Sequence, residues 1–261
     1  MDIHIKYMKR CIELATRGIR NTYPNPMVGC IIVHNNKIIG EGFHEAYGSS
    51  HAEVNAINSV INQDLLSMST LYVNLEPCNH FGKTPPCTKL IIDKGIKNVI
   101  IGSRDPNSLV KGGGINTLIS SGCNVEHGIM KDKCDKLNKR FFTFHNQRRP
   151  YVILKWAESK DGFISPRKSD RNEQKIFWIS NEQSKKMSHY FRSQEHSILV
   201  GVQTVIDDDP ELTTRLVDGK NPIRIVLDPN NRIPNNSKVL SPESETIIFS
   251  KTKNLELKNN N

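Results

Sequence analysis

The sequence contains no hydrophobic run approaching the length of about 18 residues that a transmembrane helix requires. Only 36% of its 261 residues are hydrophobic, and its mean hydropathy is -0.49. The first residues, Met1 to Lys6, are polar and lack the apolar centre of a secretory signal peptide. These absences predict no membrane association and a cytoplasmic location.

Charge of one sign is not concentrated in either half of the chain. The net charge is +9, and residues 1–146 contain 17 basic and 12 acidic side chains, whereas residues 147–261 contain 19 and 15. The two excesses, +5 and +4, come without a basic tail or an aromatic-rich basic patch. The sequence therefore predicts no nucleic-acid partner, while a modest positive charge suits a small phosphorylated substrate.

Cysteines are few and do not form the pattern of a disulfide framework. There are six in a chain without a secretory signal, which argues against structural disulfides. Four of them are expected to be chemically idle packing residues in helices or strands. These four are Cys11, Cys30, Cys123 and Cys134.

The other two cysteines belong to a pattern that predicts a catalytic zinc site. His51, Cys78 and Cys87 supply one imidazole and two thiolates, which leaves the fourth tetrahedral position for water. Glu53 lies two residues after His51 and is not needed as a ligand. Its carboxylate would take a proton from that water and pass it to a leaving amine, as in zinc deaminases.

The spacing of the two cysteines departs from the common P-C-x-x-C signature of such deaminases. Eight residues separate Cys78 from Cys87, and they are rich in glycine, proline, lysine and threonine. This insert is expected to form a loop that crosses the pocket and can carry substrate-binding groups. The alternative is that His51, Cys78 and Cys87 are ordinary core residues, because buried free cysteine is common.

Periodicity predicts that strands and helices alternate in residues 1–146. Such alternation indicates a three-layer α/β domain with a largely parallel region. Residues 147–150 are expected to be a linker. The predicted helices are 2–18, a helix after His51, 88–94, 115–120 and 130–144, and the predicted strands are 28–33, 37–40, 70–76, 99–102 and one near Val125. Lys111 to Gly114 is expected to be a flexible loop, since it lacks the G-x-x-x-x-G-K-[ST] phosphate-loop motif.

Residues 151–261 are expected to form a second α/β domain. A helix is predicted over residues 181–192, preceded by Trp178. Strands are predicted at 151–157, 197–201, 222–228 and 246–250.

The string P-C-N-H-F-G-K-T-P-P-C at residues 77–87, with His51-Ala52-Glu53 and Pro24–Gly29 upstream, resembles the deaminase half of the RibD family of riboflavin-biosynthesis enzymes. The resemblance implies a cytidine-deaminase-like fold and the zinc-dependent removal of an amino group from a phosphoribosylated diaminopyrimidinone. It also implies that substrate is contacted by Asn25, His44, Lys83, Asp105 and Asn107, with Lys83 on the phosphate. From the residues alone, Asn25 is equally a turn residue, His44 a surface histidine and Lys83 an exposed loop lysine.

Residues 151–261 resemble the N-terminal part of the family's dihydrofolate-reductase-like, NADPH-dependent reductase domain. Cofactor positions implied by the resemblance are Ala157, Trp178, Thr204 and Asp208, and substrate positions are Arg192, Leu212 and Arg215. Two features depart from the pattern: Ile176 replaces a small polar residue, and Ser165–Gln174 is long and charged. A glycine-rich segment for the cofactor phosphates is lacking, so an incomplete domain with weak or absent NADPH oxidation is expected.

Two other functions compete with this reading. A nucleoside or tRNA-base deaminase would share the H-x-E motif and the cysteines, but the long insert and the second domain disfavour it. A zinc-stabilised scaffold without catalysis is the non-enzyme alternative. A homo-oligomer is expected.

Overall fold

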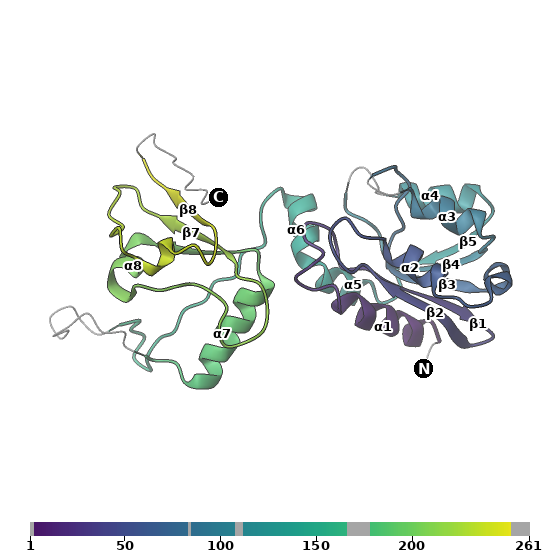
Figure 1. Cartoon of the computed structure of the whole chain (residues 1–261). Coiled ribbons are helices and arrows are strands. Elements are labelled where there is room, and N and C mark those ends of the chain that lie inside the picture. Colours follow the sequence, from purple (N-terminus) through teal and green to yellow (C-terminus); the bar gives the residue numbers. More distant parts are fainter. Residues whose placement is uncertain (1–2, 83–84, 108–111, 166–177, 252–261) are drawn as a thin grey trace. The chain divides into compact units, whose positions relative to one another are not determined.

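The computed structural model describes residues 3–82, 85–107, 112–165 and 178–251. The chain divides into two compact units, Met1–Val152 and Ile153–Asn261. Figure 1 shows the elements of each unit in sequence colours, from purple at the N-terminus to yellow at the C-terminus. No helix among the described residues is both long enough and apolar enough to cross a membrane.

The first unit is built on a five-stranded sheet with the order β2-β1-β3-β4-β5. Strand β1 pairs antiparallel with β2 and β3, whereas β3, β4 and β5 run parallel. The carboxyl ends of β3 and β4 therefore meet at one edge of the sheet, where side chains from both can gather. The strands are β1 (Gly29–His34), β2 (Lys37–Phe43), β3 (Thr70–Leu75), β4 (Asn98–Ser103) and β5 (Asn124–His127).

Helices cover both faces of this sheet, and alternate strand residues divide between the two hydrophobic cores. Ile32 and Val73 face the core under α2, α3 and α4, while Ile31 and Tyr72 face the core under α1 and α5. The expected three-layer α/β fold is confirmed. The bounds are α1 (Ile3–Thr16), α2 (Ala52–Asn58), the 3-10 helix η1 (Gln63–Met68), α3 (Cys87–Asp93), α4 (Gly113–Ser120) and α5 (Lys131–Leu137). The four cysteines expected to pack are all buried.

The single helix predicted over residues 130–144 is wrong, because the chain breaks at Asn138 into α5 and α6 (Lys139–Gln147). The Asn138 amide donates from Nδ2 to the Met27 carbonyl at 2.9 Å and accepts at Oδ1 from the Met27 N–H at 2.8 Å. These long-range bonds fix Asn138 outside helical geometry. The glycine-rich loop prediction is also corrected at its end, since Gly113 and Gly114 begin α4.

The second unit contains a three-stranded parallel sheet in the order β6-β7-β8. Its small core joins Val226 of the central strand to Val202 and Val205 of α8. The bounds are α7 (Glu182–Gln194), β6 (Ser197–Gly201), α8 (Val202–Asp208), β7 (Ile223–Leu227), the 3-10 helix η3 (Lys238–Leu240) and β8 (Thr246–Phe249).

Arg224 on β7 is fully buried, at 0% exposure. Its guanidinium donates to the carbonyl oxygens of Ser241 and Ser244, and to Ser241 Oγ at 3.1 Å. Burial lowers the pKa of Arg224. The buried charge is thus stabilised by oriented carbonyl dipoles, and these bonds hold the loop before β8 against the sheet.

The strand predicted over residues 151–157 is wrong. The segment contains no strand, and Leu154 and Trp156 are 78% and 63% exposed. A β-strand needs a neighbour to receive its backbone hydrogen bonds, and no described strand pairs with this segment. Its apolar residues match a strand by composition alone.

Candidate functional site

Three elements bring the predicted metal ligands together. His51 is the N-cap residue of α2, Cys78 follows β3, and Cys87 is the first residue of α3. Helix α2 lies directly on β2 because Gly42 has no side chain: a Cβ there would lie 2.3 Å from the Ala56 nitrogen. This close approach fixes the distance between α2 and the sheet, and His51 lies at the N-terminus of that helix.

The geometry of the three side chains fits a zinc ion. His51 Nδ1 lies 3.2 Å from Cys87 Sγ and 3.5 Å from Cys78 Sγ, and the three ligand atoms all lie within 4.8 Å of one another. Tetrahedral zinc with ordinary bond lengths separates N and S ligands by about 3.5 Å. The donor set therefore suits zinc, with Nδ1 as the coordinating nitrogen.

Hydrogen bonds favour the thiolate form of Cys78, which is the form that binds a metal cation. The Cys87 thiol and the His51 ring lower the pKa of Cys78, and the Cys87 N–H also donates to Cys78 Sγ at 3.4 Å. Cys78 raises the pKa of His51 by hydrogen bonding, and raises that of Cys87 in the same way, together with burial. The site thus favours one thiolate with the remaining proton on Cys87, which metal binding would release.

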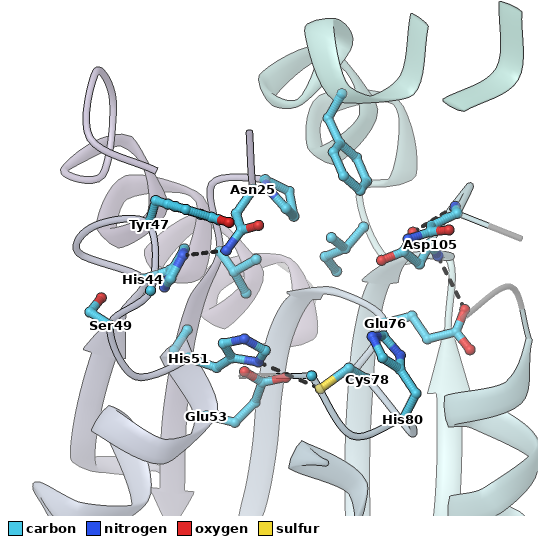
Figure 2. A pocket seen from close by; sticks show the side chains of 18 residues that line it. Asn25, His44, Tyr47, Ser49, His51, Glu53, Glu76, Cys78, His80 and Asp105 are labelled. Carbon is cyan, nitrogen blue, oxygen red and sulfur yellow. Dashed lines mark hydrogen bonds between the residues drawn. The ribbon is translucent and has the colours of Figure 1, made fainter. Parts of the chain in front are cut away.

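Glu53 lies beside this cluster on the first turn of α2, 3% exposed. Burial is the main cause that raises the pKa of its carboxyl, and the nearby Cys78 adds to it. A raised pKa makes this carboxyl a better proton acceptor, as a proton shuttle requires. Figure 2 shows Glu53 and His51 side by side, facing Cys78.

A cavity of about 240 Å³ opens over the cluster. Its lining combines His51, Cys78 and the predicted proton shuttle Glu53 with amide, carboxyl and aromatic groups (Figure 2). Of the residues that the resemblance implies for deaminase substrate, the cavity brings together Asn25, His44, Asp105 and Asn107. Lys83, the fifth, lies outside the described residues.

Asn25, His44 and the Ser50 carbonyl form a chain of two hydrogen bonds, here called the Asn25–His44 relay, in which each donor and acceptor is defined. His44 Nδ1 lies 3.0 Å from the Ser50 carbonyl, which can only accept, so Nδ1 carries the ring proton. His44 Nε2 then accepts from Asn25 Nδ2 at 3.1 Å. Burial lowers the pKa of His44, which keeps this neutral form. The relay therefore directs the amide oxygen of Asn25 away from His44, as Figure 2 shows.

Asp105 follows β4 on the other side of the cavity. Its Oδ1 accepts from the Asn107 N–H at 2.7 Å, which shapes the turn that carries both side chains. Burial raises the pKa of Asp105 to about 7, and the Glu76 and Cys78 charges act in the same direction. This carboxyl can thus serve as donor or acceptor to a polar ligand near neutral pH.

Sequence reasoning missed several lining residues. Tyr47, Ser49, His80 and Phe141 line the cavity but carry no motif of their own. His80 lies inside the string that carried the resemblance, and Glu76 directly precedes Pro77-Cys78. Proximity to a ligand cysteine was the available signal for both.

In the second unit, Arg192, Leu212 and Arg215 lie close together. Arg192 donates to the Thr213 carbonyl at 3.1 Å, and Arg215 donates to Thr213 Oγ1 at 2.8 Å. Burial lowers the pKa of Arg192, and the Arg215 charge adds to it. The two guanidiniums repel each other, and the Glu211 carboxylate, 2.7 Å from Arg215 Nη1, offsets part of this repulsion.

The four residues implied for the cofactor are more dispersed. Thr204 and Asp208 lie one turn apart on α8, and Ala157 lies in a segment without regular secondary structure at the start of the second unit. Trp178 is 60% exposed, with Lys185 Nζ 4.0 Å from its ring centroid. Their cofactor roles stay predictions, and Ile176 and the 166–174 segment lie outside the described residues.

His189 on α7 holds the backbone of Arg215 in place. The low pKa of His189 predicts that the stability of the second unit depends on pH. Its Nδ1 accepts from the Arg215 N–H at 3.0 Å. Burial, with Arg192 and Arg215, lowers its pKa from 6.5 to about 4. Between these two pKa values His189 binds a proton in the unfolded chain but not in the folded unit. The stability that neutral His189 contributes is therefore complete above pH 6.5 and is lost as the pH falls toward 4.

We expect His189→Asn to weaken this pH dependence, because the Asn amide oxygen keeps an acceptor for Arg215 but does not titrate. Urea unfolding of the full chain can be followed by the fluorescence of Trp156 and Trp178, both in the second unit. An equal loss of stability on acidification in variant and wild type would assign the effect to other groups.

Comparison with known proteins agrees with this architecture. Residues 1–103 match the family model described as the cytidine and deoxycytidylate deaminase zinc-binding region, and residues 150–260 match the RibD C-terminal domain. The fold and the site thus define a zinc-dependent deaminase of the cytidine-deaminase class, joined to a reductase-type domain.

Individual relatives narrow the class to one family. The chain is 42% identical over 255 residues to riboflavin biosynthesis protein RibD of Aquifex aeolicus. The aligned region covers 97% of this chain and 70% of that protein. The crystal structure of a diaminohydroxyphosphoribosylaminopyrimidine deaminase/5-amino-6-(5-phosphoribosylamino)uracil reductase from Thermotoga maritima superimposes with a TM-score of 0.87 at 40% identity, covering 97% of this chain and 71% of that one. The chain belongs to the RibD family.

Two further matches show how much of the family the chain spans. A diaminohydroxyphosphoribosylamino-pyrimidine deaminase of Buchnera aphidicola subsp. Schizaphis graminum is 53% identical over 136 residues, 52% of this chain and 91% of that protein. The chain spans 66% of the RibD protein of Actinobacillus pleuropneumoniae and 62% of that of Bacillus amyloliquefaciens.

Proposed function

We propose that the first unit catalyses the hydrolytic deamination of 2,5-diamino-6-(5-phosphoribosylamino)pyrimidin-4(3H)-one. The observation that carries the proposal is the buried Glu53 beside three converging metal ligands, at the floor of a cavity lined by hydrogen-bonding groups. Zinc held by His51, Cys78 and Cys87 would supply Lewis-acid activation of water at neutral pH. The ring C–NH2 becomes C=O: water supplies the oxygen and one proton that turns the amino group into ammonia, and its other proton remains on the ring nitrogen.

The chain's own residues then have separate tasks. Glu53 takes a proton from the attacking water and returns it to the leaving amine. Asn25 presents its amide oxygen to ring or exocyclic N–H donors, because His44 already occupies its NH2 group. Asp105 and Asn107 bind from the opposite wall, and Lys83 is proposed for the phosphate.

Ammonia release from the zinc-loaded full chain tests this function. The phosphoribosyl diaminopyrimidinone is expected to be deaminated, whereas cytidine and adenosine-containing RNA are not. Activity on either of the latter would favour the nucleoside or tRNA-base alternative. Full zinc occupancy without ammonia from any of the three would favour the scaffold.

We further propose that the second unit binds the deaminated product through its ribose phosphate, for NADPH-dependent reduction of the ribosyl chain. Support comes from Arg192 and Arg215: burial lowers the pKa of Arg192, and the Arg215 guanidinium lies close enough to lower it further. Substrate-dependent loss of the reduced-nicotinamide absorbance tests the reduction. Arg215→Gln should weaken binding of the phosphorylated product more than that of its dephosphorylated form, and an equal loss would contradict the assignment.

The relay between Asn25 and His44 yields a prediction for substrate affinity. Asn25→Ala is expected to raise the deamination KM by about tenfold, because one hydrogen bond to a ring N–H is lost. Steady-state ammonia release measures this, with zinc content checked in parallel. Asn124→Ala serves as control, since Asn124 is an exposed amide on β5 that bonds Asn98. A KM equal to that of the control would remove Asn25 from the substrate.

A further inference from the structure

Glu76 is a buried carboxylate that no motif explained. It directly follows β3 and is 4% exposed. Three backbone N–H groups donate to it: that of Asp105 at 3.1 Å and that of Gly112 at 3.2 Å to Oε2, and that of Ile115 at 3.1 Å to Oε1. A buried charge is costly unless it is paired, and these three charge-assisted bonds are what stabilise it.

The donors come from described residues on both sides of residues 108–111. Asp105 lies before residues 108–111, and Gly112 is the N-cap residue of α4 after them. The first turn of α4 contains no acidic residue of its own, so Glu76 supplies the negative charge that a helix N-terminus favours. One side chain thus ties β3, the end of β4 and the start of α4 together.

The same junction contains the metal ligand Cys78, two residues after Glu76. The α4 backbone lies against this stretch so closely that a Cβ on Gly114 would come within 2.0 Å of the Pro77 carbonyl oxygen. Cys78 on one strand end and Asp105 on the next are therefore coupled through Glu76. A displacement of either would change the distance between the metal site and the substrate-binding wall.

We propose that Glu76 is a positioning residue for deamination: it sets the Asp105–Asn107 turn relative to the Cys78 metal site, and so the fit of the pyrimidine. The assignment rests on the proposed deaminase function. Both Glu76 oxygens are engaged by backbone N–H groups of the neighbouring elements, so its loss is expected to act first on substrate binding. An error of about 1 Å in such placement is enough for a large kinetic effect.

Glu76→Gln tests the proposal because the amide has the shape of the carboxylate. Its oxygen can keep the two bonds made by Oε2, but its NH2 then faces the Ile115 N–H, donor against donor. We expect KM to rise by about tenfold while kcat changes less than about threefold and zinc content is unchanged. Glu41→Gln is the matched control, since that carboxylate accepts from Arg10 Nε at 2.7 Å on β2, away from the cavity.

Hydrogen exchange of the zinc-loaded full chain supplies a readout independent of turnover. Asp105 and Ile115 amides should exchange faster in Glu76→Gln than in Glu41→Gln. Unchanged KM and exchange would overturn the proposal, and so would zinc loss or a fall in kcat at constant KM, since either places Glu76 at the metal. If the wild type releases no ammonia, the proposed function fails, whereas unchanged Asp105 exchange alone still rejects the positioning role.

Discussion

Glu53→Gln is expected to lower the rate of ammonia release by at least about a hundredfold while leaving zinc bound. The amide keeps the shape of the side chain and its packing at the start of α2, but it cannot accept the proton of the attacking water. Glu53 is buried beside His51 and Cys78, so bulk water cannot easily replace it as the proton carrier.

The measurement is kcat for ammonia release, with zinc-to-protein stoichiometry determined on the same samples. Glu41→Gln again serves as control, because it removes a hydrogen-bonded carboxylate from the same unit without touching the cavity. Near-normal turnover by Glu53→Gln would reject its role as proton shuttle. Loss of zinc would instead show that Glu53 contributes to holding the metal.

Cys87→Ser is expected to lose zinc and, with it, all measurable deamination. Serine keeps a hydrogen bond donor at the start of α3, but its hydroxyl is a far poorer zinc ligand than a thiolate. Only His51 and Cys78 would remain. Because zinc binds the folded site, its loss should also lower the midpoint of thermal unfolding.

Metal analysis after dialysis against zinc-free buffer measures the first effect. Cys123→Ser is a suitable control, since that thiol is buried elsewhere and its hydrogen bond to the Ile96 carbonyl can be kept by a hydroxyl. Full zinc occupancy in Cys87→Ser would show that the ligand set is wrong. In the wild type, zinc affinity should fall as the pH is lowered, because the raised pKa of Cys87 means that binding must displace a proton.

The metal ligands and most of the first unit could be predicted because their signals are local. His51 and Glu53 lie two residues apart at a helix start, and the P-C sequence at Cys78 follows a clear apolar strand. Ile31, Ile32 and Val33 alternate between the two cores, and a strand buried on both faces is recognised in the sequence as a continuous apolar run. Such patterns depend on neighbours in sequence and need no knowledge of the fold.

The errors arose where a distant partner decides the local structure. Residues 151–157 have the composition of a strand but no described strand beside them, and Asn138 breaks a helix because its amide bonds Met27. Propensity is a weak prior, and tertiary contacts override it in both places.

The sequence by itself determined the chemistry of this protein: one imidazole, two thiols and a carboxylate at residues 51, 78, 87 and 53. The tertiary structure alone decided how the side chains around these groups are oriented and placed. The orientation of Asn25 depends on His44 and Ser50, and the junction of Asp105 with α4 depends on Glu76. Hydrogen bonds of this kind join residues far apart in the chain, so no periodicity or motif contains them until the strands are in place.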